Sequence, residues 1–128
     1  MHRSKLAGFI IDCQTTDLHG AARFWSQALG MEQKVLPAEE GGKYVRLLDP
    51  QHRLHIEVQR VSHSSRVHLD IETDDIDAEV RRLTALGATV VERVHTWCVM
   101  AAPTGQRFCV VRAASQDFSR SASEWPAG

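Results

Sequence analysis

The pattern of apolar and polar residues is clearest in the middle of the chain, in the segment Arg66–Gly87. Residues 67–72, VHLDIE, alternate strictly between apolar and polar, and a period of two predicts a half-buried strand. After an acidic turn, apolar residues recur every three to four positions, which predicts an amphipathic helix. We expect Asp74 or Asp75 to cap the start of this helix and Gly87 to end it.

The same order of elements occurs earlier in the chain, where Phe9–Gly30 again reads as strand, Thr-Asp turn and helix ending in Leu-Gly. The first strand is predicted at Leu6–Cys13 and its helix at Asp17–Leu29. Each predicted helix is followed by three strand-like segments, which are Met31–Leu36, Lys43–Asp49 and Arg53–Arg60, then Ala88–Val94, Thr96–Ala102 and Arg107–Arg112. The chain therefore contains two copies of a strand-helix-strand-strand-strand unit, and such a repeat outweighs any single-residue signal.

The length of 128 residues suits one domain rather than two independent ones. We expect module one at about 6–60, a linker at 61–65 and module two at about 66–112, with the two modules sharing a core either within the chain or across a dimer. Residues 113–128 show no periodicity and are predicted to form a mobile tail, with Phe118 or Trp125 as a point of attachment.

The overall charge gives no field that would attract nucleic acid or an anionic membrane, because 15 basic residues face 16 acidic ones. No apolar run approaches the roughly 18 residues that cross a bilayer, and no apolar segment follows the N-terminus as in a signal peptide. Cys13, Cys98 and Cys109 are odd in number and lie in predicted strands, which indicates reduced thiols and a cytoplasmic protein.

Three runs carry a resemblance to a known superfamily: TTDLHGAARFWSQALGM, RVHLDIETDDIDAEVRRLTALGA and PTGQRFCVV. The chain resembles the vicinal oxygen chelate superfamily, which includes glyoxalase I, extradiol dioxygenases and the bleomycin and fosfomycin resistance proteins. The HLD strand and the G-x-x-F-C end strand are most similar to its bacterial glyoxalase-like domain branch. The resemblance implies an α+β fold in which two βαβββ modules form a cupped mixed sheet with helices outside. It also implies a divalent metal, zinc, nickel, iron or manganese, and a homodimer.

The superfamily's four metal ligands are only partly present at the matching positions. Two of them fall on His68 and Glu57, a third falls on Ile10 or Ile11, and the last falls on Cys109. Isoleucine cannot bind a metal, so the common glyoxalase I ligand set is absent.

A reduced metal site remains one interpretation, in which His68, Glu57 and Cys109, helped by His55 or Asp70, hold zinc. The favoured interpretation has no metal, and a small organic ligand fills the cup. In it, hydrogen-bonding residues orient the ligand, aromatic residues stack on it, and arginines recognise a carboxylate or phosphate. The candidates are His55, Glu57, His68 and Asp70, then Trp97 and Tyr44, then Arg46 and Arg107.

Three functions remain open at this point. The first is a metal-independent binding protein, and the second is a lyase or isomerase in which Glu57 and His68 act as acid and base on a small carbonyl compound. Cys109 is a ligand contact or, with His68 as its base, a nucleophile, although simple packing is the plainer interpretation. The third is a subunit whose cup only forms a dimer core. The other histidines are predicted to be solvated, and these are His2, His19, His52, His63 and His95.

Overall fold

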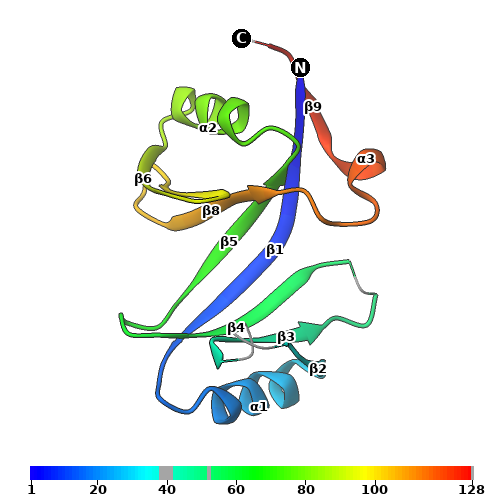
Figure 1. Cartoon of the computed structure of the whole chain (residues 1–128), viewed down its shortest axis with the longest axis vertical. Coiled ribbons are helices and arrows are strands. Elements are labelled where there is room, and N and C mark those ends of the chain that lie inside the picture. Colours follow the sequence, from blue (N-terminus) through cyan, green and yellow to red (C-terminus); the bar gives the residue numbers. More distant parts are fainter. Residues whose placement is uncertain (38–41, 52, 128) are drawn as a thin grey trace. The chain divides into compact units, whose positions relative to one another are not determined.

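The computed structural model describes residues 1–37, 42–51 and 53–127, and they divide into two compact units (Figure 1). Unit 1 comprises Met1–Ala7 and Leu69–Gly128, and unit 2 comprises Gly8–His68. Two long strands, β1 (His2–Gln14) and β5 (Arg66–Thr73), contribute residues to both units. His52, expected to be solvated, and most of the predicted loop at 37–42 lie outside the described residues.

Unit 2 is a mixed sheet with one helix packed on it. The strand order is β2 (Glu32–Val35), β3 (Tyr44–Leu48), β4 (His55–Val61), β1, and only the β4–β1 pair is parallel. Helix α1 (Leu18–Leu29) begins after Asp17, whose carboxylate accepts a hydrogen bond from the Gly20 amide. The core joins one face of α1 to one face of the sheet through Leu18, Ala22, Val45, Leu47, Ile56 and Val58.

Unit 1 has the same plan, with the order β5, β8 (Arg107–Arg112), β7 (Trp97–Ala101), β6 (Thr89–Val94) and a parallel β5–β8 pair. Helix α2 (Ile76–Ala85) is capped by Asp75, and Gly87 follows its C-cap with φ of 110°. Its core consists of Val80, Ala88, Cys98, Met100, Phe108 and Val110. Among the described residues, no helix is long and apolar enough to cross a membrane.

The ends of the chain differ from the prediction. Strand β1 begins at His2 instead of Leu6, because β9 (Ser123–Trp125) pairs with its first residues in an antiparallel arrangement. The expected mobile tail contains β9 and a short helix, α3 (Phe118–Ser121), so the prediction of a largely unstructured tail is wrong. The expected point of attachment at Trp125 is confirmed, since its indole N–H donates to Ser4 Oγ at 2.8 Å.

Candidate functional site

The candidate site is built on the face of the unit 2 sheet that points away from α1, which we call the distal face. Side chains alternate along a strand, so the residues between the core positions of β3 and β4 lie on this face. Strand register aligns them in rows across the sheet. One row is Ile10, Glu57 and Arg46, the next is Asp12, Gln59 and Tyr44, and His55 lies before them.

The strongest polar contact of the distal face joins Asp12 and His68. Asp12 is 2% exposed, and its Oδ2 lies 2.7 Å from Nδ1 of the half-buried His68. Arg66 Nε is 3.8 Å from the same oxygen. Asp12 Oδ1 is buried and has no hydrogen-bond partner among the described residues. A buried carboxylate that is only half satisfied is costly for the fold, which makes it a functional candidate.

Glu57 and Arg46 are cross-strand neighbours in the adjoining row. The Glu57 carboxylate is 14% exposed, and its Oε1 lies 3.3 Å from His55 Nε2. Arg46 is half-buried, and its Nε has no hydrogen-bond partner among the described residues. A half-buried guanidinium whose Nε is unsatisfied is suited to a carboxylate or phosphate oxygen of a ligand.

Tyr44 and Gln59 form a second polar pair on the distal face. The Gln59 side-chain amide donates to the Tyr44 hydroxyl at 3.0 Å, and the two residues are register partners. This contact joins two members of the row that contains Asp12. The predicted site residues of module one, with His68, therefore belong to one unit and gather on or against one face.

The other predicted site residues belong to unit 1. Asp70 on β5 is the register partner of Cys109 on β8, and both are half-buried. Arg107 is exposed at the start of β8. Residue types of this kind, together with histidine, can hold a divalent metal.

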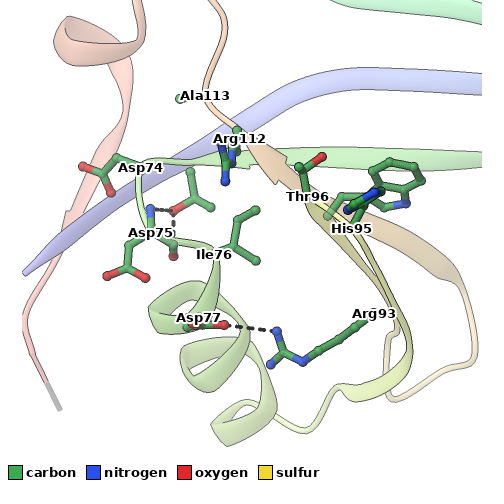
Figure 2. A pocket seen from close by; sticks show the side chains of 11 residues that line it. Asp74, Asp75, Ile76, Asp77, Arg93, His95, Thr96, Arg112 and Ala113 are labelled. Atoms are coloured by element: carbon green, nitrogen blue, oxygen red, sulfur yellow. Dashed lines mark hydrogen bonds and ion pairs between the residues drawn. The ribbon is translucent and has the colours of Figure 1, made fainter.

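Trp97 is one of the residues that line a cavity of about 640 Å³ in unit 1. Figure 2 shows this cavity from close by. The cavity is bounded by the start of α2, the β6–β7 turn and the end of β8, where His95 and Arg112 are exposed. Arg93 closes one side through an ion pair with Asp77 at 3.1 Å. Trp97 is 38% exposed, so stacking on a planar molecule stays a prediction for this residue.

The superfamily's metal site does not fit the residues of unit 2. Strand register shows that Ile10 is the partner of Glu57 on the distal face, whereas Ile11 pairs with Val58 on the α1 side. Ile10 therefore occupies the position of the missing first-strand ligand. An isoleucine side chain has no donor atom, so the four-ligand set cannot form.

Two features of the structure, the role of Asp12 and the burial of His2, were not predicted from the sequence. Asp12 interrupts the apolar run FIIDC, and a single acid in such a strand could have marked it as a buried functional group. His2 was expected to be solvated, but it is 6% exposed, and its Nε2 lies 2.7 Å from the buried Glu79 Oε1. His19, His63 and His95 are exposed as predicted.

Solved structures with the same fold include enzymes. The chain is 19% identical to methylmalonyl-CoA epimerase from Mycobacterium tuberculosis, over 87% of this chain and 89% of the other, with a TM-score of 0.58. It is 17% identical to the Streptomyces coelicolor methylmalonyl-CoA epimerase in complex with 2-nitronate-propionyl-CoA, over 87% and 98%, with a TM-score of 0.57. A hypothetical protein from Bacillus halodurans C-125 gives 12% identity over 88% and 96%, and a TM-score of 0.62. At these identities the likeness shows the fold alone.

The fold is the α+β fold of the vicinal oxygen chelate superfamily, which confirms the prediction made from the repeat and its motifs. The model of the glyoxalase-like domain family matches residues 8–111, and the chain belongs to that family. No curated protein matches the chain in sequence at a significant level.

Proposed function

We propose that the distal face of unit 2 binds a small organic ligand, with His68, Glu57 and Arg46 as the residues that recognise it. The observation that carries the proposal is the 2.7 Å contact between His68 and the buried Asp12. Removing a carboxylate from water is unfavourable, and a partly satisfied one adds little stability. A buried carboxylate that instead fixes a neighbouring histidine is typical of sites that bind or convert small molecules.

The residues define the chemistry of the ligand. In the tautomer whose Nδ1–H donates to Asp12, Nε2 is the basic atom of the neutral His68 ring. Arg46 supplies a planar pair of N–H donors for a carboxylate, and Glu57 supplies an acceptor in the same row. We infer a ligand that combines an anionic oxygen with a carbonyl or hydroxyl group.

An enzyme is the second candidate, and the orientation of His68 by Asp12 favours it. With a carbonyl compound on the distal face, Glu57 or His68 would remove a proton from the carbon next to the carbonyl. The other residue would then return a proton to that carbon or to its neighbour, as in an epimerase or isomerase. The epimerases of the same fold act on methylmalonyl-CoA, which makes that compound a suitable probe.

The metal-dependent version of this enzyme stays a separate proposal. It would use His68, Glu57 and Cys109 to hold zinc, nickel, iron or manganese. Ile10 argues against the superfamily's usual four-ligand coordination, because it has no donor atom at the position of the first-strand ligand. Assembly as a homodimer and a cytoplasmic location, expected from the sequence, also stay proposals. None of them is needed for a ligand to bind unit 2.

The experiment is a titration of the isotope-labelled chain with malonate and with methylmalonyl-CoA, followed by backbone amide chemical shifts. We expect saturable shifts at Arg46, Glu57 and Gln59. In His68→Ala the affinity should fall at least about tenfold, which corresponds to about 1.4 kcal/mol. The matched control is His63→Ala, because His63 is exposed and its one side-chain hydrogen bond among the described residues is with the neighbouring Ser64 carbonyl oxygen.

Equal affinity in His68→Ala and His63→Ala, or the absence of saturable shifts on the distal face, would show that the proposed site is wrong. A second measurement separates the two functions. If the chain is an enzyme, deuterium from D₂O should enter the carbon next to the carbonyl of methylmalonyl-CoA, and Glu57→Gln should stop this exchange. Binding without exchange of that hydrogen supports a binding protein.

A further inference from the structure

Unit 2 contains a cavity of its own, of about 550 Å³, at the ends of strands β1 and β4. Three segments supply its polar lining. The first is the end of β1 with the turn that follows it, the second is the residue before β3, and the third is the end of β4. The residues are Gln14, Thr15, Thr16, Lys43, Arg60 and Ser62. None of the described residues that line it is acidic, which sets it apart from the cavity beside α2.

No acidic residue in the described part of the chain forms an ion pair with either cation of this cavity. The Arg60 guanidinium donates to the Gly42 carbonyl oxygen, with N–O distances of 3.4 Å from Nε and 3.3 Å from Nη2. Within the described part of the chain, the Lys43 ammonium has neither a hydrogen bond nor an ion pair. Two nearby positive charges without a counter-charge create a local potential that attracts an anion.

The neutral lining residues add hydrogen-bond donors. Thr15, Thr16 and Ser62 carry hydroxyl groups that can each donate one proton. Gln14 ties the walls together, because its side-chain amide donates to the Ser62 carbonyl oxygen and its backbone N–H donates to Ser65 Oγ, both at 2.9 Å. Donors that arrive from several directions suit the tetrahedral oxygens of a phosphate group better than the two coplanar oxygens of a carboxylate.

The cavity lies beyond the end of the β1–β4 pair. Its two cations alternate onto the α1 side of the sheet, because Arg60 follows Val58 by two residues and Lys43 precedes Val45 by two. Gln14 and Val61 are register partners, and they follow Asp12 and Gln59 by two residues in an unbroken β1–β4 pairing. Two residues of strand span about 6.6 Å. The cavity therefore lies one row beyond Gln59 and two rows beyond Glu57, which is about 13 Å along the strand.

We propose that this cavity binds a phosphate or phosphate-ester group, with Lys43 and Arg60 as the residues that neutralise its charge. The inference does not depend on the proposed function, because the two cations lie on the α1 side of the sheet and not on the distal face. Neither cation is among the residues that the distal-face site uses.

The test uses inorganic pyrophosphate and inorganic phosphate as probes, with the full-length chain at constant ionic strength. We expect saturable amide shifts at Thr15, Thr16 and Ser62 with each probe. In the double variant Lys43→Gln/Arg60→Gln, the affinity should fall at least about tenfold. The control Arg23→Gln/Arg53→Gln removes the same charge from two exposed residues of unit 2, and it should bind as the parent does.

Shifts that do not saturate, or an equal loss of affinity in the two double variants, would overturn the proposal, because both indicate only a general attraction to net charge. The probes contain no organic part, so the result does not depend on the ligand of the distal face. His68→Ala should bind pyrophosphate normally even if it loses malonate. Loss of pyrophosphate binding in His68→Ala would also contradict the separate phosphate site.

Discussion

Glu79 provides the sharpest test of how unit 1 holds its termini together. It lies on α2 and is fully buried, and it accepts two hydrogen bonds of 2.8 Å from the Arg82 guanidinium. His2 lies 2.7 Å from the same carboxylate, and Arg82 also covers the Trp125 ring at 3.9 Å from its centroid. Burial raises the pKa of the Glu79 carboxyl, but its hydrogen bonds to Arg82, His2 and Ser4 outweigh burial and hold the pKa below its ordinary value.

The perturbation is Glu79→Gln, which keeps the shape of the side chain and removes its charge. Breaking a buried ion pair costs about 3–5 kcal/mol, and Arg82 is 24% exposed, so water recovers part of that loss. We therefore expect the free energy of unfolding to fall by about 3 kcal/mol. The matched control is Glu124→Gln, whose pair with Arg3 spans 3.2 Å between side chains that are 51% and 38% exposed. Its cost should be about 0–1 kcal/mol.

The assay is urea unfolding of the three proteins, followed by circular dichroism, from neutral pH to about pH 3. A carboxyl whose folded pKa is lowered contributes stability above its unfolded pKa, for which the ordinary value is 4.5. That contribution is lost as the pH falls through the folded pKa. The difference between the parent and Glu79→Gln should therefore shrink below about pH 4.5. The reasoning is refuted if Glu79→Gln costs no more than Glu124→Gln, or if the difference is the same at every pH.

Three further outcomes follow from the structure. Gly8→Ala should destabilise the chain by about 2 kcal/mol or more in the same urea assay, because a Cβ there would lie 1.9 Å from the His55 carbonyl oxygen. Gly42→Ala, with open space around it, should cost under about 1 kcal/mol, and equal costs would contradict this packing. In native protein, iodoacetamide should modify Cys109 before Cys98, since Cys98 is fully buried and its burial raises the pKa of its thiol. Mass spectrometry that shows the reverse order of modification would contradict this prediction. Dialysis against EDTA should leave the malonate-induced shifts intact, whereas their loss and recovery with zinc would establish the metal-dependent alternative.

The elements predicted from the sequence are those whose signals are local. The alternation in VHLDIE predicted the strand that the structure has as Arg66–Thr73. Of the two acids proposed as N-cap of the next helix, Asp75 is the one that accepts from the Ala78 amide. The apolar face of a helix, its cap and its final glycine lie within a few residues of one another, so a short window of sequence contains them all.

The C-terminal segment could not be predicted in this way, because its structure depends on residues at the other end of the chain. Strand β9 is only Ser123–Trp125, too short for a pattern of alternation to be recognised. It is held by pairing with β1 and by the contact between Trp125 and Ser4. The burial of His2 has the same cause, since Glu79 is distant in sequence but adjacent in unit 1.

In the candidate site, the positions of the residues on their strands were predictable from the sequence, but the partners of their side chains were not. Repeated modules predict where a strand lies and which of its positions share a face. Glu57 was identified from this alternation and from the resemblance, and Arg46 from the ability of its guanidinium to recognise a carboxylate or phosphate. They do not predict which partner a side chain acquires across strands, so the contact between Asp12 and His68 was not predicted. Ile10 and Asp12 are two residues apart on one face; Ile10 has no donor atom, whereas the Asp12 carboxylate contacts His68. Two neighbouring positions of one strand thus differ completely in the chemistry they can support, which is why the fold alone does not define the reaction.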